Sequence, residues 1–219
     1  MRVTFEDVYR LPAVRTYIER ADDSLRAIGY TEHSFAHVNK VANLAHEILL
    51  KLGYSEREAE LARIAGYLHD IGNMINRQDH AQSGAILAFR ILDNLQADPE
   101  DIATIITAIG NHDEGSAFPV NPVAAALILA DKADVRSSRV RNQDFATFDI
   151  HDRVNYSVKK SELCIEKDSH IELRLQIDTE ICAVMDYFEI FLERMIMCKR
   201  AAECLNCRFR LVANGSKLC

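Results

Sequence analysis

The sequence lacks several features that would assign a protein to a particular class. Its apolar runs are all shorter than the roughly 18 residues of a membrane-spanning helix, and residues 1–7 carry mixed charge without an apolar signal-peptide core. These absences predict a cytoplasmic protein. Cysteine is missing from the first 163 residues, and the six that follow include a single CxxC pair, Cys204 and Cys207. A structural zinc site normally needs two such pairs, so we expect reduced and mostly buried thiols.

Positive charge is also scarce, since 26 Lys and Arg residues face 33 Asp and Glu residues and give a formal net charge of -7. This balance argues against a broad surface for a nucleic-acid polymer. It does not exclude a small phosphorylated substrate, because the charge at one site can oppose the overall sign. The hydrophobic content of 48% supports a sizeable core in one large domain or in a domain with an appendage.

Apolar residues at helical spacing predict a helical domain over residues 1–156. The expected helices cover residues 4–10, 12–28, 31–52, 55–70, 80–95, 98–113 and 121–133, and the last of them is apolar nearly all round, which indicates a central position. The pattern then changes. Residues 157–219 predict a small α+β appendage packed on the same domain, with a hairpin (161–166 and 171–177), a long helix (178–204) and a final strand, turn and strand end over 207–219. The fold class is therefore mainly α.

The stretch from Leu68 to Gly72 is the first candidate for chemistry. A helix with an apolar face delivers His69 and Asp70 to the edge of the core, and Gly72 allows a sharp exit from the helix. A neutral imidazole beside a carboxylate suits a divalent transition metal, and the carboxylate can bridge two ions.

Asp131 is the second candidate, because an ionised carboxylate within an apolar helix is costly unless it is paired or binds a metal. A salt bridge to Lys132 is not expected to be the whole explanation, since adjacent helical residues point apart. His37 lies four residues after His33 on one helix face, and His80 and His112 stand at helix ends. The remaining acidic and imidazole side chains are expected at the surface or beside the ligands: His33, His46, His151, Glu47 and Glu114.

The order of these residues resembles the HD-domain superfamily of metal-dependent phosphohydrolases. The surrounding segments are similar as well, over about residues 30–140: His37-Val38-Asn39-Lys40-Val41-Ala42-Asn43-Leu44-Ala45, Gly66-Tyr67-Leu68-His69-Asp70-Ile71-Gly72 and Leu129-Ala130-Asp131-Lys132-Ala133-Asp134. The resemblance implies an HD-type helical bundle with a metal held by His37, His69, Asp70 and Asp131. In branches with additional histidines, here His80 and His112, it implies a second metal bridged by Asp70.

The branch that cleaves cyclic dinucleotides differs from this sequence at two places. Asn73 stands where that branch has Lys, and Gly115 to Pro119 replace its Gly-Tyr-Pro element. We therefore expect cyclic dinucleotides to be poor substrates.

The expected activity is hydrolysis of a small, nucleotide-like phosphate ester by metal-activated hydroxide, with two divalent ions. The metal is Mn, Fe, Co, Ni or Zn, with Mg also admitted. Catalytic roles fall to Asp70 and to Lys132, which could steer phosphate; Arg136 and Arg139 are expected on a solvated face. Two alternatives stay open: a metal-stabilised binding or regulatory module without turnover, and a di-iron oxygenase on the same fold. No membrane partner is expected, and a homo-oligomer is left open.

Overall fold

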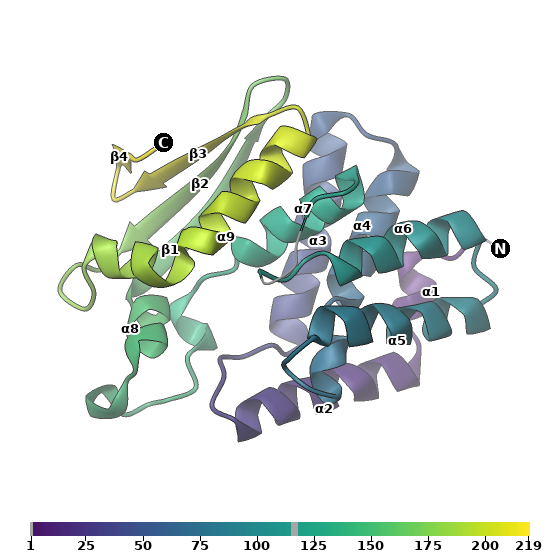
Figure 1. Cartoon of the computed structure of the whole chain (residues 1–219), viewed down its shortest axis with the longest axis horizontal. Helices are drawn as coiled ribbons and strands as arrows, with labels where there is room; N and C mark the ends of the chain where they lie inside the picture. The colour runs from purple at the N-terminus through teal and green to yellow at the C-terminus, as the bar shows by residue number, and fades with distance from the viewer. Residues whose placement is uncertain (1, 115–117) are drawn as a thin grey trace.

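The computed structural model describes residues 2–114 and 118–219 and shows a mainly helical chain with a small sheet, as predicted (Figure 1). Between the helices expected over residues 55–70 and 80–95 lies a short 3-10 turn, Ile71–Met74. The residues Gly115 to Ala117, at which the sequence differs from the cyclic-dinucleotide branch, lie outside the described residues. The N-terminal helices are α1 (Phe5–Tyr9), α2 (Pro12–Ala27), α3 (Phe35–Leu52), α4 (Glu56–Leu68), α5 (His80–Asn94), α6 (Pro99–Gly110) and α7 (Pro122–Lys132).

Polar residues fix where the helices of the site begin. The Ser55 hydroxyl accepts a hydrogen bond from the backbone N–H of Glu58, and the Glu58 side chain accepts one from the backbone N–H of Ser55, which completes a capping box at the start of α4. Asp98 caps α6 with Pro99 at its first position, and Asn121 caps α7 in the same way before Pro122. These three caps fix where α4, α6 and α7 begin.

Helix α7 is the centre of the helical body, as its all-round apolar sequence predicted. Its residues from Val123 to Ala130 are all buried, and it packs against α3, α4, α6 and the C-terminal helix α9 (Val184–Cys204). An acidic residue near the end of such a helix is surrounded by protein on several sides, which is the position of Asp131.

Two glycines permit close approaches beside the site. A Cβ at Gly66 would lie 2.8 Å from the Ala42 Cα, so glycine is required where α4 crosses α3. A Cβ at Gly72 would lie 1.9 Å from the His80 carbonyl oxygen. The expected reason for Gly72, a sharp helix exit, is therefore incomplete: its φ is not left-handed, and the residue instead lets the turn after α4 touch the start of α5.

The C-terminal part follows a short helix, α8 (Ile150–Ser157), which leads directly into strand β1 (Val158–Glu166). β1 pairs antiparallel with β2 (His170–Ile177) through the predicted hairpin, and β2 pairs parallel with β3 (Arg208–Ala213), for which α9 is the crossover. β3 then pairs with the short strand β4 (Ser216–Lys217). Helix α9 begins six residues later than predicted because residues 178–182 form a turn closed by the Asp178 carbonyl.

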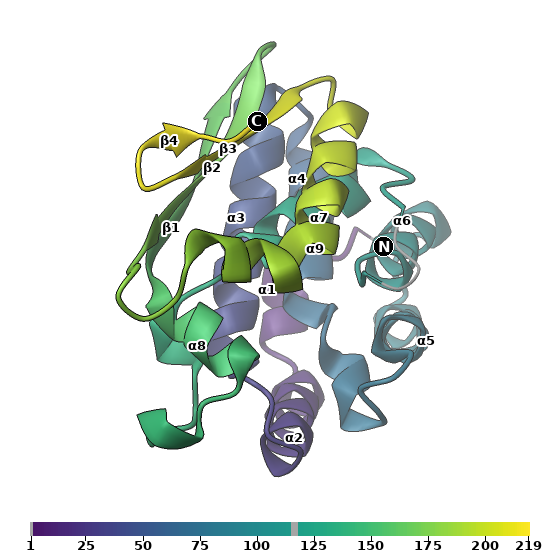
Figure 2. The same ribbon diagram turned by 60° about the vertical axis from the view of Figure 1, so that its left-hand side comes forward.

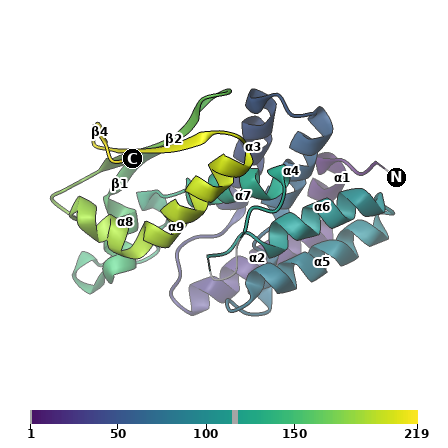
Figure 3. The same ribbon diagram turned by 45° about the horizontal axis from the view of Figure 1, so that its top comes forward.

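Helix α9 joins the sheet to the helical body. It packs against β2 and β3 and also against α7, and Figures 1 and 3 show it running beside both. The sheet stands at the opposite side of the molecule from α5 and α6 (Figure 2). The division of the chain at residues 156 and 157 remains a prediction.

Other expectations from composition can be compared with the structure directly. All six cysteines are free; Cys182, Cys198 and Cys207 are buried and Cys219 is exposed. Among the described helices, none is both long and apolar enough to cross a membrane.

Candidate metal centre

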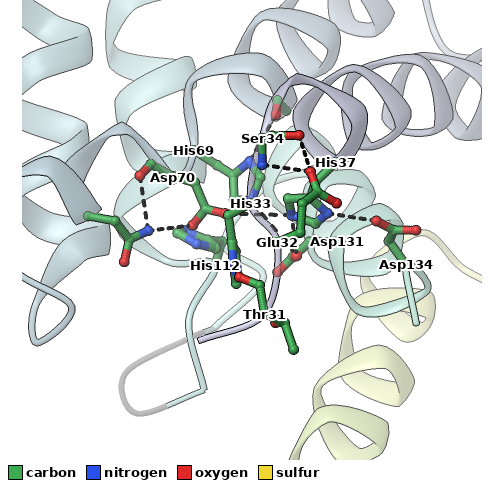
Figure 4. A network of polar contacts seen from close by, with 12 residues as sticks. Thr31, Glu32, His33, Ser34, His37, His69, Asp70, His112, Asp131 and Asp134 are labelled. Atoms are coloured by element: carbon green, nitrogen blue, oxygen red, sulfur yellow. Dashed lines mark hydrogen bonds and ion pairs between the residues drawn. The ribbon is translucent and has the colours of Figure 1, made fainter. Parts of the chain in front are cut away.

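Six side chains from five helical elements meet beside α7. They are the predicted ligands, and each stands in the first or last turn of a helix or directly after it: His37 (α3), His69 and Asp70 (after α4), His80 (α5), His112 (after α6) and Asp131 (α7). Figure 4 shows His37, His69, Asp70, His112 and Asp131 converging. Three groupings of these residues bring donor atoms close enough to hold an ion: His37, His69 and Asp70; His69, His112 and Asp131; and Asp70, His80 and His112.

Asp70 divides its two carboxylate oxygens between two sets of histidines. Its Oδ2 lies 3.1 Å from His69 Nε2 and 3.5 Å from His37 Nε2, whereas its Oδ1 lies 3.6 Å from His80 Nε2. His80 Nε2 in turn lies 3.2 Å from His112 Nε2, which is close to the separation of about 3 Å between two imidazole ligands of one ion. This geometry suits a carboxylate that bridges two metal positions.

Asp131 completes the side formed by His37 and His69. Its Oδ1 lies 3.4 Å from His37 Nε2 and 3.8 Å from His69 Nε2. Its Oδ2 lies 2.8 Å from Lys132 Nζ, so the expectation that these adjacent residues point apart is wrong. Lys132 is the last residue of α7, and its long, flexible side chain folds back along the helix end toward the carboxylate.

The four imidazoles are oriented by hydrogen bonds from Nδ1. His69, His80 and His112 donate to the backbone carbonyls of residues 66, 77 and 109, three positions earlier in each case, and His37 donates to Asp134 Oδ2 at 2.8 Å. In metal centres such hydrogen bonds fix the tautomer and present Nε2 to the ion. Here all four Nε2 atoms face the same region.

The burial of these nitrogens tests whether a metal fits. His37 and His69 are fully buried, and the Nε2 atom of each makes no hydrogen bond to any of the residues that the structure describes. Leaving a buried polar atom unsatisfied costs free energy, which a bound ion would offset. The nitrogen and oxygen donors suit a divalent transition metal, so the residues fit such an ion.

The protonation states of His80, His112 and Asp70 favour the same chemistry. For His69, burial opposes protonation, but the Asp70 carboxylate raises the pKa in the metal-free protein. Burial, with His69 and His80 beside it, lowers the pKa of His112 to about 3, and burial also lowers the pKa of His80. Burial opposes ionisation of Asp70, but His69 and the other imidazoles hold the pKa of its carboxyl well below the usual value. Near neutral pH, two imidazoles thus keep a free lone pair and the shared carboxylate keeps its charge.

The site opens into a cavity of about 410 Å³. Asp70, His80, His112 and Asp131 lie on its wall. Cationic side chains from several elements also line it: Arg77, Lys132, Arg139 and Arg194. Among the residues placed beside the ligands by the sequence, His33 and His151 line this cavity, whereas Glu47 pairs with Lys51 at the surface.

Asp134 is a site residue that the sequence interpretation passed over. It is buried, and besides His37 it binds Lys40 Nζ at 2.7 Å and Arg136 Nε at 3.0 Å. Burial opposes its ionisation, but the hydrogen bond from His37 and the nearby cations lower the pKa of its carboxyl. The signal available in the sequence was a second acidic residue three positions after Asp131, between Lys132 and Arg136.

The expected solvated face for the two arginines is wrong for Arg139. This side chain is buried and donates to the carbonyl oxygens of Asp134 and Glu32 at 2.8 Å. Arg136 is partly buried and pairs with Glu32 as well as Asp134. Both residues follow α7 in a segment that turns back over the start of α3, so they anchor this segment rather than face water.

Asn73 has a defined role in this arrangement. Its side-chain amide donates to Asp70 Oδ1 at 2.9 Å and to the Asp70 backbone carbonyl at 3.0 Å. The residue that departs from the cyclic-dinucleotide branch therefore holds the shared carboxylate in place. Of the other departure, Gly115 to Ala117 lie outside the described residues.

The fold and the site together define a mainly helical protein with a cluster of His and Asp residues that could hold a metal at the ends of its helices. Residues 34–139 match the family model of the HD domain. The chain therefore contains an HD domain over these residues, as the sequence resemblance predicted, and this domain supports a metal-dependent phosphohydrolase in general.

The chain is also similar in sequence to individual proteins, over different parts of its length. The chain is 23% identical over 202 residues to an uncharacterized protein of Methanocaldococcus jannaschii, covering 82% of this chain and 78% of that protein. It is 28% identical to ribonuclease Y of Streptococcus sanguinis over 153 residues, 68% of this chain and 27% of the relative. It is 30% identical to ribonuclease Y of Aliarcobacter butzleri over 122 residues, 54% of this chain and 21% of the relative. The chain thus spans about a quarter of these ribonucleases or less.

Among solved structures, a predicted HD superfamily hydrolase from an uncultured Thermotogales bacterium is similar. The identity is 25% and the TM-score 0.44, over 60% of this chain and 73% of that one.

Proposed function

We propose that this protein hydrolyses a small, nucleotide-like phosphate ester with two divalent ions. His37, His69, Asp70 and Asp131 would hold the first ion, and His80 and His112 would hold the second with Asp70 shared. The observation that carries the proposal is the position of Asp70, whose two oxygens face different histidine sets on the wall of a cavity of about 410 Å³.

The protein side chains have distinct parts in this proposal. Divalent ions in the site would polarise the phosphate group and lower the pKa of water. Asp70 and Asp131 hold negative charge at fixed positions, and Asn73 keeps Asp70 oriented. Lys132 lines the cavity beside Asp131 and is placed to attract phosphate oxygens. Arg77 Nη1 lies 3.2 Å from His80 Nε2, so Arg77 offers a second cation beside the proposed position of the second ion.

The cavity favours a small substrate. Its volume lies within the range of roughly 300–1,000 Å³ that is usual for small-molecule sites. Tyr30 lines it with a partly exposed ring, which provides an apolar face for a base or another planar group. The named activity of the ribonuclease Y relatives makes an RNA phosphodiester the competing substrate class. The net charge of -7 favours the small, nucleotide-like phosphate ester over the RNA polymer.

The test is a phosphate-release assay on the purified protein, with chromatography of the products for the phosphodiester substrates and metal content measured on the same sample. The substrates are nucleoside mono- and polyphosphates, a cyclic dinucleotide and a short RNA, each with Mn, Fe, Co, Ni, Zn or Mg added. We expect turnover of a nucleotide, loss of turnover after treatment with a chelator, and poor cleavage of the cyclic dinucleotide.

Three results would overturn the proposal. Bound metal without turnover of any substrate would indicate a binding or regulatory module. Iron with an oxidised chromophore and no phosphate release would indicate an oxygenase. Cleavage of RNA in preference to every nucleotide would assign the site to a polymer.

A further inference from the structure

One cation in the cavity comes from outside the HD match. Arg194 lies on α9, far beyond residue 139, yet it lines the cavity together with Phe191 of the same helix. Its guanidinium lies 4.3 Å from the centre of the Phe191 ring. Phe191 is buried, so the ring restricts where the guanidinium can go.

Arg194 is connected to the ligands by a chain of ion pairs. Arg194 Nε lies 2.6 Å from Glu114 Oε1, and the same oxygen lies 3.3 Å from Lys132 Nζ. Lys132 in turn contacts Asp131 at 2.8 Å. Glu114 Oε1 therefore lies between the cations of Lys132 and Arg194. Lys132 links this carboxylate to Asp131, which is a proposed metal ligand.

The arrangement has the properties of an anion site. Lys132 is buried and Arg194 is about 28% exposed, so neither cation is fully hydrated. A planar guanidinium presents its five donors in a fixed fork, and Glu114 engages the Nε atom. The stack on Phe191 and the pair with Glu114 hold this fork at the cavity wall, which reduces the entropy lost when it binds a ligand.

We infer that Arg194 binds the phosphate group of the substrate, so that the C-terminal α9 completes a site whose metal ligands all lie in the HD match. Glu114 and Phe191 are positioning residues for this guanidinium. The inference rests on the proposed function for the identity of the anion as a phosphate ester.

A structural role for Arg194 is the competing explanation, since its pair with Glu114 also ties α9 to the segment after α6. Three variants separate the two roles: Arg194→Gln removes the charge, Arg194→Lys keeps it without the planar fork, and Arg200→Gln is the matched control. Arg200 is exposed on the same helix and does not line the cavity.

The experiment measures three quantities for the metal-loaded wild type and each variant: the affinity for inorganic phosphate by calorimetry, the metal content, and the midpoint of thermal unfolding. We expect Arg194→Gln to weaken phosphate binding by about tenfold to a hundredfold, because a charge-assisted hydrogen bond is lost. Arg194→Lys should fall between this variant and the wild type. Arg200→Gln should bind as the wild type does, and metal content should be equal in all four proteins.

Steady-state kinetics on a substrate identified in the phosphate-release assay sharpens the result. Arg194→Gln should raise KM by a similar factor, whereas a purely structural defect would lower the active fraction and leave KM unchanged. Phosphate affinity equal to wild type in Arg194→Gln would overturn the inference. If that variant does not fold, wild-type affinity in Arg194→Lys would overturn it instead.

The outcomes also distinguish this inference from the proposed function. A wild type that binds phosphate through Arg194 and hydrolyses nothing would refute the hydrolase and leave the anion site standing. If the wild type hydrolyses a nucleotide and the Arg194 variants behave as the wild type does, the proposed function stands and the phosphate-binding role of Arg194 is refuted. A wild type that binds no phosphate would overturn the inference.

Discussion

The metal-centre region and the C-terminal sheet with α9 are held together by different kinds of interaction. In the first, six buried or nearly buried polar side chains stand at helix ends and depend on one another through short contacts. In the second, α9 packs on α7 on one side and on β2 and β3 on the other, and Arg194, held by an ion pair, lines the cavity from α9 beside Phe191. Under the proposed function, the first region would hold the metals and the second would shape what binds beside them.

The sharpest way to break the first region is Asp70→Ala. Because Asp70 is the proposed ligand of both ions, we expect metal content near zero and activity lower by about a thousandfold or more. Asp70 follows the last turn of α4, and its replacement leaves no apolar cavity, so far-ultraviolet circular dichroism should change little. Full phosphatase activity in this variant would refute the site assignment.

Removing His80 and His112 together should abolish the second of the two proposed metal positions. In the double variant His80→Ala, His112→Ala we expect metal content to fall from about two ions per chain to about one, since the other four ligands remain. The measurement is metal per chain by mass spectrometry.

One ion per chain in both proteins, with activity lost in the variant, would contradict the two-ion model. The two histidines would then bind the substrate beside Arg77, which already contacts His80.

Asp134 allows the support of a ligand to be weakened without touching the ion. Asp134→Asn keeps a hydrogen-bond acceptor for His37 Nδ1, whereas Asp134→Ala removes it and leaves Lys40 and Arg139 without this carboxylate. We expect Asp134→Ala to weaken metal binding by about tenfold to a hundredfold and Asp134→Asn to weaken it less. Titration of the metal-free protein with Mn or Zn gives the values. Equal affinity in the wild type and both variants would show that Asp134 acts only on the fold.

The smallest expected effect concerns the helix crossing beneath the site. Gly66→Ala forces α3 and α4 apart by the contact with Ala42, so the free energy of unfolding should fall by about 1–3 kcal/mol in urea denaturation. Gly110→Ala is the control, because its Cβ would meet only the Ala85 Cβ at 3.7 Å. That variant should unfold at the same urea concentration as the wild type or slightly higher. A stabilising Gly66→Ala would mean that the crossing is loosely packed.

The helices could be predicted from local signals, and the metal residues from their place at helix ends. Capping residues such as Ser55, Asp98 and Asn121 indicate where helices begin, and the apolar residues on all sides of α7 indicate its central position. The parts that could not be predicted depend on long side chains at the ends of elements. Lys132 folds back on Asp131, and Arg139 is buried against backbone carbonyls, because each has enough rotatable bonds to reach a partner that no local pattern specifies.

The sequence by itself determined a mainly helical body, a C-terminal hairpin and long helix, and a set of His and Asp residues ordered as in HD domains. These follow from periodicity, caps and residue chemistry, which act over a few positions along the chain. Only the tertiary structure decided that the two oxygens of Asp70 face different histidines, that Asp134 orients His37, and that Arg194 reaches the cavity from α9. Asp134 and Arg194 act on parts of the chain about 80 to 100 positions away, where only the packing of α3, α7 and α9 sets the distance.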